Sequence, residues 1–528
     1  MIIEFDLKAC YQKKERQEIF NFKNTECQQE FFKLTNNTQK FTGCFKNYLP
    51  FEDQAKNWNS VLKSCFHQSF KKVRVTHKVK IKETEISKLQ QKRKELKNRI
   101  LNKNEDLDDE LQEVETIIAN MCSKENRDKV VENFKSFGDN QERLNTNGMW
   151  NVKRKIFPKN NPIKPTGKKN ARGQIITSPE GLKDLYLETY TKRLRHRPIM
   201  EDLKEIKQLK EKLFYLRLEI CKRTKSNPWK MEDLDKVLKS LKTTKARDPL
   251  GLVNDLFKPE VIGQDLKESL LALFNQMKDK GIIPEFVQWA NITSLYKGKG
   301  ERLDLDNDRG IFLVTVFRSI IMKMIYNDKY DILDQNISDS IVGARRGKNI
   351  RNHIFVINGI IMDVLSSKSK SIDIGILDYR QCFDSMWLEE TLNDLYEGGM
   401  KDNNLVTLYE ANKKVKVAVK TPHGLTERKE IEKIILQGDV FGPIQCSMSV
   451  DTFGKECLAE GKHLYSYKGE VDVPPLAMVD DLLIVTECGF KSAMANSFIN
   501  CKTNLKKLQF GIDKCHKMHV GKKRIEEI

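Results

Sequence analysis

The sequence contains no long run of apolar residues, and Met1 to Asp6 lack the basic segment and apolar core of a secretion signal. Its 12 cysteines are scattered singly, with no Cys-x-x-Cys pair. Isolated cysteines are typical of reduced thiols in the cytosol or nucleus. Cys515, His516 and His519 form one Cys/His cluster, but no second ligand pair follows at zinc-finger spacing. We therefore expect a nuclear or cytoplasmic protein that is not secreted and has no membrane anchor, disulfide framework or zinc finger.

Acidic residues are too few to balance the basic ones. The 528 residues include 93 Lys and Arg but 74 Asp and Glu, which gives a net charge of +19. Such an excess favours a large anionic partner. Nucleic acid ranks ahead of a membrane surface because the sequence has no basic amphipathic anchor. The length predicts two to four domains with hydrophobic cores of their own.

Residues 1–145 are expected to form a mainly helical, basic N-terminal region. Between Leu89 and Met121, apolar residues recur at spacings of three, four and seven, which predicts one face of a long helix or a helical hairpin. Between Lys71 and Lys103 there are thirteen basic residues and three acidic ones. Two interpretations stay open: an arm that follows a phosphate backbone, or a solvated helix whose charges only keep it soluble.

Residues 146–230 are expected to form a basic connector to a third region, residues 231–528. The first part of the connector is rich in Pro, Gly and basic residues, which is typical of loops. Lys153, Arg154 and Lys155 are candidates for contacts with nucleic-acid phosphates. A plain linker explains the composition equally well.

Two basic loops in the third region are candidate phosphate sites. Predicted strands at Trp289–Tyr296 and Ile311–Val316 flank a loop with Lys297 and Arg309, and two such cations can hold a polyphosphate. A second basic loop precedes a predicted helix at 350–365, where helix N–H groups favour anions. The cations of this second loop are Arg345, Arg346 and Lys348. Either loop can also be an ordinary surface feature.

Three aspartates lie at the ends of predicted strands. Asp378 ends a strand that begins at Ser371, and Asp480 and Asp481 lie at the tip of a predicted hairpin between two apolar runs. Tight hairpin turns favour glycine, which this one lacks, and adjacent carboxylates repel unless a cation or a proton lies between them. The pair therefore predicts a metal site with oxygen ligands, with a solvated surface turn as the alternative.

Three further segments complete the pattern. Phe383 lies five residues after Asp378, where the chain is expected to fold back over whatever the carboxylate binds. Gln437 and Gly438 follow an apolar run, and glycine there lets the backbone approach a ligand closely. Lys514 closes a Phe-Gly-Ile-Asp-Lys segment near the end of the chain.

In this order the segments resemble the fingers and palm of reverse transcriptases, most closely those of non-LTR (LINE-type) retrotransposons. The resemblance covers residues 230–520. The motifs that carry it are Lys245–Gly251, Asn307–Ile311, Val342–Arg346, Asp378 with Phe383 (motif A), Gln437-Gly438 (motif B), Asp480-Asp481 (motif C) and Lys514 (motif D). It implies an α+β fold for residues 231–528, a right-hand polymerase palm and fingers with an antiparallel sheet and packed helices.

The resemblance implies an RNA-directed DNA polymerase, a nucleotidyltransferase that extends a DNA primer on an RNA template with deoxynucleoside triphosphates. Asp378, Asp480 and Asp481 would be catalytic and would hold two Mg²⁺ ions, with Mn²⁺ as an alternative. Phe383 would exclude a 2′-hydroxyl group. The nucleotide-binding residues would be Lys297, Arg309, Phe383, Gln437, Gly438 and Lys514. The resemblance implies no membrane partner and does not identify a protein partner.

The sequence also departs from the family. Asn307-Asp308-Arg309-Gly310 stands where Asn-Tyr-Arg-Pro is common, and Met478 replaces an aromatic residue, which bears on nucleotide fit more than on the chemistry. Related proteins carry an N-terminal endonuclease and a C-terminal thumb, and this chain is expected to begin after the first and stop before the second. The alternative function is therefore a catalytically dead RNA-binding remnant. A maturase like those of group II introns has little support.

Overall fold

The structure is a computed structural model. It describes residues 24–70 without 37 and 46–48, residues 167–223 without 195–199, residues 227–460 with short gaps, residues 464–487 and 514–521, and a few positions between 92 and 132. Two compact units are present, residues 20–72 with 165–528 and residues 1–19 with 73–164. The described elements discussed below belong to the first unit.

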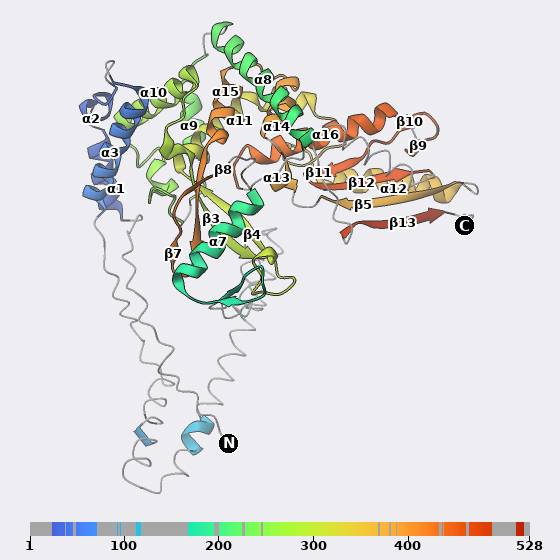
Figure 1. The fold of residues 1–528 in the computed structure, drawn as a ribbon, viewed down its shortest axis with the longest axis horizontal. Helices are drawn as coiled ribbons and strands as arrows, with labels where there is room; N and C mark the ends of the chain where they lie inside the picture. Colours follow the sequence, from blue (N-terminus) through green and yellow to red (C-terminus); the bar gives the residue numbers. More distant parts are fainter. Residues whose placement is uncertain are drawn as a thin grey trace. The chain divides into compact units, whose positions relative to one another are not determined.

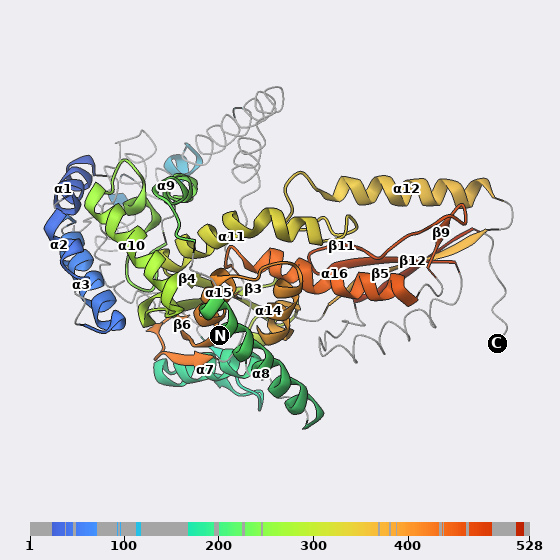
Figure 2. The same cartoon turned by 90° about the horizontal axis from the view of Figure 1, so that it is seen from above.

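A four-stranded antiparallel sheet, here called the palm sheet, has the strand order β11-β12-β5-β13 (Figure 1). Side chains alternate between its faces, so Ile372 and Ile374 pack against α12 while Leu377 joins the larger core on the other side. Figure 2 shows α12 and α16 on opposite sides of these strands. The elements are β5 (Ser371–Asp378), β11 (Leu476–Met478), β12 (Asp481–Thr486), β13 (His516–Gly521), α12 (Ile350–Ser366) and α16 (Gly442–Glu460).

A second sheet, here called the finger sheet, has the order β4-β3-β6-β7, with β8 also paired to β6. Strands β3 and β4 form the antiparallel hairpin predicted around the basic loop, but β4 begins at Asp308 rather than Ile311, so Arg309 lies in the strand. Strands β3 and β6 run parallel. Its strands are β3 (Trp289–Tyr296), β4 (Asp308–Val314), β6 (Val415–Thr421), β7 (Gly424–Leu425) and β8 (Lys429–Ile431).

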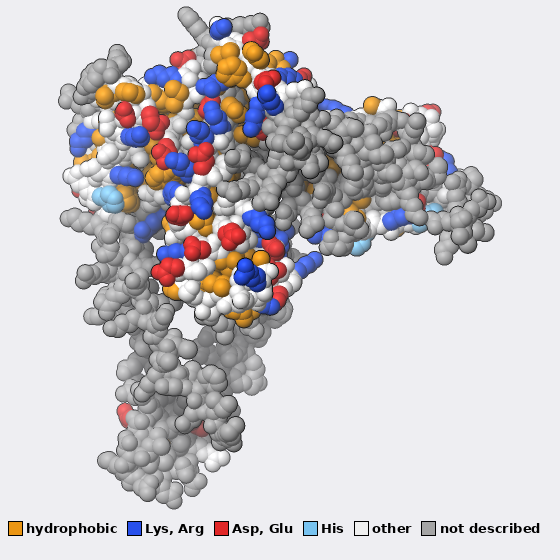
Figure 3. All heavy atoms as spheres, viewed as in Figure 1, with side chains coloured by type: hydrophobic (Ala, Val, Ile, Leu, Met, Phe, Trp, Pro, Cys, Tyr) orange, Lys and Arg blue, Asp and Glu red, His pale blue; other side chains and the backbone are white. Residues whose placement is uncertain are grey.

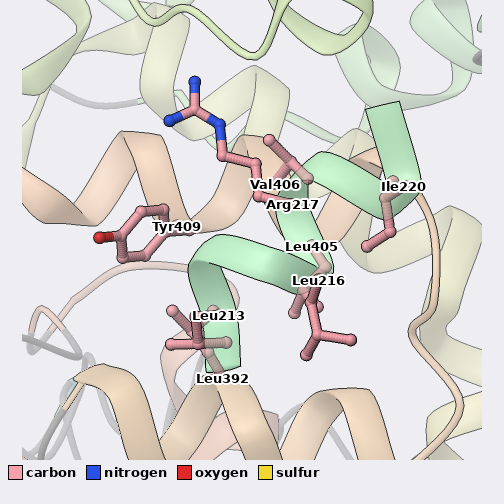
Figure 4. A pocket seen from close by; sticks show the side chains of 8 residues that line it. All are labelled: Leu213, Leu216, Arg217, Ile220, Leu392, Leu405, Val406 and Tyr409. Atoms are coloured by element: carbon pink, nitrogen blue, oxygen red, sulfur yellow. The ribbon is translucent and has the colours of Figure 1, made fainter. Parts of the chain in front are cut away.

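Further helices belong to the same compact unit as the two sheets. Gly281, with a φ of 58°, ends α10 as its position after the last apolar residue predicts. Leu213, Leu216 and Ile220 of α8 line a small apolar pocket with residues of α14 and α15 (Figure 4). These helices are α7 (Pro179–Leu194), α8 (Met200–Arg223), α9 (Met231–Ser240), α10 (Gln264–Lys280), α11 (Val316–Asn336), α13 (Cys382–Ser385), α14 (Leu388–Glu397) and α15 (Asn403–Lys413). The short elements are β1 (Lys168–Lys169), β2 (Ile175–Ile176), β9 (Ser466–Tyr467), β10 (Val471–Asp472) and the 3₁₀ turns Asn254–Phe257, Glu285–Gln288 and Leu305–Asn307.

Three N-terminal helices, α1 (Thr25–Thr35), α2 (Thr38–Thr42) and α3 (Phe51–Ser69), pack into the same core as the finger region. Trp58 is fully buried, donates a hydrogen bond to Ser269 (3.0 Å) and meets the Phe317 ring edge-on at 5.4 Å between centroids. Residues 20–72 thus group with residues 165–528 in one compact unit, and the expected domain boundaries at residues 145 and 230 stay predictions.

The architecture confirms the expected α+β fold, with an antiparallel palm sheet, packed helices and a helical N-terminal part. Among the residues described, none of the helices combines the length and apolar character needed to cross a bilayer.

Asp248 ties the Lys245–Gly251 motif to the start of α11. Its carboxylate accepts hydrogen bonds from the backbone N–H groups of Leu250 and Leu252 (2.8 Å each) and of Val316 (3.0 Å). The side chain is buried, and burial raises its pKa to about 6 although these donors act in the opposite direction.

Asp248→Asn is expected to change how stability depends on pH. A carboxyl group with a raised pKa in the folded protein binds its proton more tightly than in the unfolded chain, so its stabilising contribution is lost as pH rises from about 4 to above 6. The shift corresponds to about 3 kcal/mol. In urea unfolding at a series of pH values, the variant should gain roughly that much relative to wild type between pH 4 and 7. A stability difference that does not vary with pH would contradict the assignment.

Candidate active site

The three candidate catalytic aspartates lie together at one end of the palm sheet. Asp378 is the last residue of β5 and stands opposite Asp481, the first residue of β12, in the antiparallel register. Opposite residues on neighbouring strands have Cα atoms about 4.5–5.5 Å apart. Asp480 precedes Asp481 in the turn from β11. Asp378 therefore lies at the same end of the sheet as Asp480 and Asp481, which are more than a hundred residues further along the chain.

The hairpin turn differs from the prediction by one residue. Met478 pairs with Asp481, so the turn consists of Val479 and Asp480, and Asp481 belongs to β12. Val479 has a φ of 63°, a conformation that β-branched residues rarely adopt and that such turns usually give to glycine. A Cβ added to Gly343 would lie 2.3 Å from the Val479 nitrogen. The close backbone of Gly343 therefore helps to hold the strained turn.

Asp480 is unfavourable as an anion in this position. Burial raises the pKa of Asp480, and the negative charges of Asp481 and Asp378 raise it further, while Arg309 lowers it. The ammonium group of Lys514 forms an ion pair with Asp378 Oδ2. The three aspartates thus repel one another, and one of them already binds a cationic side chain.

Basic side chains from the β3–β4 hairpin, from α7 and from the segment before β13 interact electrostatically in this region. Burial lowers the pKa of Lys297, and the positive charges of Arg193, Arg309 and Lys514 lower it further. Lys297 donates to the carbonyl oxygen of Asp306 at 2.9 Å, and Arg309 is exposed on β4. Such cations beside carboxylates suit a ligand that carries several phosphates.

Two other predicted site residues, Phe383 and Gly438, lie within the part of the chain that the structure describes. Phe383 lies in α13 and packs, partly buried, against the main core. Gly438 has a φ of 116°, and a Cβ there would come within 2.9 Å of the Phe312 carbonyl oxygen in β4. Only glycine suits both constraints. Gln437 lies outside the described residues, as do Lys153, Arg154 and Lys155.

In the basic loop before α12, the side chain of Arg345 is buried. Arg345 is only 8% exposed, and its guanidinium donates to Asp334 Oδ1 (2.7 Å) and to the carbonyl oxygens of Ser338 (2.7 Å) and Ile341 (2.9 Å). These bonds commit Arg345 to the structure of the loop. The internal role of Arg345 competes with the contact with nucleic acid that we expected for it. The composition of the loop did not indicate this internal role.

The outward part of the loop is Arg346 and Lys348. Arg346 is exposed, with its guanidinium 4.2 Å from the centre of the Tyr330 ring. Lys348 forms an ion pair with Asp339 at 2.7 Å. A stacked guanidinium keeps its N–H edges available, so Arg346 is the better candidate for a phosphate contact.

Sequence reasoning missed a buried ion pair behind Gly438. Arg318 of α11 has no exposed surface, and its Nε donates to Asp439 Oδ2 at 2.9 Å. Its other nitrogens donate to the carbonyl oxygen of Ala411 and to Asn412 Oδ1. The pair anchors the residue that follows Gly438. One signal was present: an arginine inside the apolar start of a helix needs a buried acceptor.

The donor chemistry of the three aspartates fits a divalent cation. No group of three or more His, Cys, Asp or Glu side chains among the described residues is arranged as a ready-made metal site. Carboxylate oxygens on adjoining strands are nevertheless the ligands that Mg²⁺ prefers. A divalent cation would also relieve the repulsion that raises the pKa of Asp480.

Comparison with known proteins gives a family match for this part of the chain. Residues 300–526, which include β4, the three aspartates and Lys514, match the family described as reverse transcriptase (RNA-dependent DNA polymerase). The chain therefore contains a reverse transcriptase domain.

Among solved structures, the chain is similar to three telomerase structures. A Candida tropicalis telomerase truncated from its C-terminal domain is 11% identical, with a TM-score of 0.34, over 46% of this chain and 52% of that one. The same enzyme with a telomeric RNA fragment is 11% identical, with a TM-score of 0.33, over 47% and 45%. A Candida albicans telomerase with such a fragment is 12% identical, with a TM-score of 0.34, over 53% and 49%. The chain spans about half the length of these proteins.

Proposed function

We propose that the chain is an RNA-directed DNA polymerase of the non-LTR retrotransposon type, which extends a DNA primer on an RNA template. The observation that carries this proposal is the meeting of Asp378 with the Asp480-Asp481 hairpin, beside the cations of the finger sheet. The reverse transcriptase match of residues 300–526 supports the reaction class. The motifs at 245–251, 307–311 and 342–346 support the non-LTR type.

Nucleotidyl transfer is an in-line displacement at phosphorus, in which the protein positions the reactants and neutralises charge. Asp378 and Asp480, with Asp481 beside them, would hold two Mg²⁺ ions, which when bound activate the primer 3′-hydroxyl and stabilise the leaving pyrophosphate. Lys297 and Arg309 would hold the triphosphate through charge-assisted hydrogen bonds. These side chains come from both sheets, so a nucleotide would bind between the palm and the fingers.

An RNA–DNA hybrid would be held through its backbone and shape. On the face shown in Figure 3, basic and acidic side chains are interspersed over the described surface. Contacts would therefore be spread over separate cations such as Arg346 and would weaken as salt rises.

A primer-extension assay tests the proposal. The purified chain, a DNA primer annealed to an RNA template and deoxynucleoside triphosphates should give extended primer only with Mg²⁺ or Mn²⁺, and EDTA should stop the reaction. A salt titration of RNA binding is run in parallel. Salt-dependent RNA binding with no extension at any metal concentration would instead support the alternative, an inactive RNA-binding remnant.

Phe383→Val is expected to let ribonucleotides in, because a smaller side chain leaves room for a 2′-hydroxyl group. Relative incorporation of ribonucleotides should rise on the order of tenfold or more. The substitution should also lower stability by about 1–3 kcal/mol, since Phe383 packs against the core.

Phe274→Val in α10 is the matched control, because Phe274 is fully buried in the same core but far along the chain from the site. It should lower stability without changing sugar selection. Unchanged discrimination in an active Phe383→Val enzyme would leave Phe383 with a packing role alone.

A further inference from the structure

We propose that residues 167–194 form a clamp that sets the position of the β3–β4 hairpin end, with Lys297 in its loop and Arg309 at the start of β4. The buried ion pair Lys168–Asp308 lies at the centre of this clamp. The clamp consists of the β1–β2 hairpin and α7. Its effect on nucleotide binding rests on the proposed polymerase function, while its effect on the loop does not.

The β1–β2 hairpin bonds directly to the loop. Lys168 and Asp308 are 6% and 4% exposed, and Lys168 Nζ lies 2.9 Å from Asp308 Oδ2. The same ammonium donates to the carbonyl oxygen of Arg302, and the backbone N–H of Lys169 donates to the carbonyl oxygen of Leu303, both at 2.9 Å. The hairpin thus bonds the middle of the loop to the first residue of β4.

Tyr190 of helix α7 is linked to Asp308 through a second set of hydrogen bonds. The Tyr190 hydroxyl donates to Ser294 Oγ at 2.8 Å, and Ser294 Oγ donates to Asp308 Oδ2 at 2.7 Å. The Tyr190 ring also covers Gly310, where an added Cβ would come within 2.6 Å of a ring carbon. Tyr190 therefore holds the residues on both sides of Arg309.

Arg193, one helical turn further along α7, forms hydrogen bonds with the backbone at the end of the loop. Its guanidinium donates to the carbonyl oxygen of Asp308 at 3.1 Å and to Asp306 Oδ1 at 2.9 Å, and also contacts the carbonyl oxygen of Leu305. Two successive turns of one helix thus fix the end of the loop.

Strand geometry connects this anchor to the active site. Successive side chains of a strand point to opposite faces, so a buried Asp308 places Arg309 on the exposed face of β4. Arg309 is there close enough to Asp480 to lower its pKa. Asp308 and Gly310 are also the two residues of this motif that depart from Asn-Tyr-Arg-Pro, and both contact the clamp.

Lys168 supplies the positive charge that is paired with Asp308, and Ser294 adds only a neutral hydrogen bond to the same carboxylate oxygen. Asp308 Oδ1 is buried and has no hydrogen-bond partner. Removing one member of a buried ion pair leaves an uncompensated charge, whereas neutralising both members is often tolerated. Lys168 and Asp308 should therefore be strongly non-additive. Neighbouring Lys169 pairs with Glu301 at the surface and offers a matched control.

Hydrogen exchange of the full chain tests the clamp without requiring activity. Five proteins are compared: wild type, Lys168→Met, Asp308→Asn, the double variant and Lys169→Met. We expect amides of residues 297–309 to exchange about tenfold faster or more in the two single variants, and to return close to wild type in the double variant. Lys169→Met should match wild type.

Nucleotide kinetics give the second readout. In an active enzyme, each single variant should raise the KM for deoxynucleotides about tenfold with kcat within about threefold, because a displaced Arg309 weakens triphosphate binding. The double variant should restore KM. Equal exchange in all five proteins, or single variants that lower kcat with KM unchanged, would overturn the clamp. A wild type that incorporates no nucleotide would refute the polymerase function, and the exchange data would still decide the clamp.

Discussion

Asp480→Asn is expected to abolish nucleotide incorporation while leaving RNA affinity within about threefold of wild type, because phosphate contacts supply most of the binding. Asparagine keeps the shape of the side chain but removes the charge that would hold a metal ion. Its stability should be equal to or higher than that of wild type. The carboxylate is disfavoured by burial and by Asp481 and Asp378, as its raised pKa shows, and the substitution removes that penalty.

Asp472→Asn is the matched control, since Asp472 is an exposed residue of β10 outside the carboxylate group. It should retain full activity. Primer extension, RNA binding and thermal unfolding are measured on both variants. Loss of activity together with a lower unfolding temperature in Asp480→Asn would indicate a folding defect, and retained incorporation would remove Asp480 from the catalytic group.

Gly438→Ala is expected to lower nucleotide incorporation about 100-fold, because its Cβ would press on the Phe312 carbonyl of β4 and displace the segment that precedes α16. The φ of 116° is also strained for alanine, which should lower stability by about 1–3 kcal/mol. Single-turnover incorporation and urea unfolding measure the two effects separately.

Gly424→Ala separates strain from contact. Gly424 has a similar φ of 103°, but an added Cβ there would meet no atom within 4 Å. This variant should lose stability to a comparable extent and keep its activity. If Gly438→Ala retained wild-type incorporation, the close approach to Phe312 would have no part in the reaction.

The strands and the carboxylates were predictable because their signals are local. The apolar run from Ser371 to Asp378 is the observed β5, and Trp289–Tyr296 is the observed β3. Apolar runs on both sides of Asp480-Asp481 indicated a hairpin, which the structure confirms. The ordered spacing of these segments then identified the polymerase fold, because no single motif is specific by itself.

The remaining features depend on contacts distant in sequence. Turn rules favour glycine, so they did not predict Val479 with a positive φ, whose close neighbour Gly343 is more than a hundred residues away. The sequence does not distinguish Arg345 from Arg346 in the basic loop, but in the structure Arg345 is buried and donates a hydrogen bond to Asp334. The sequence places Lys168 among the many basic residues of the connector, and its ion pair with Asp308, 140 residues further along, was not predictable.

Binding of Mn²⁺ to the full chain, followed by electron paramagnetic resonance, tests most directly the claim that the three aspartates form one metal-dependent site. Wild type should bind Mn²⁺, and Asp378→Asn and Asp480→Asn should each weaken binding about tenfold or more, since each removes a charged oxygen ligand. Asp472→Asn should bind like wild type. Unchanged Mn²⁺ affinity in both active-site variants would contradict the claim.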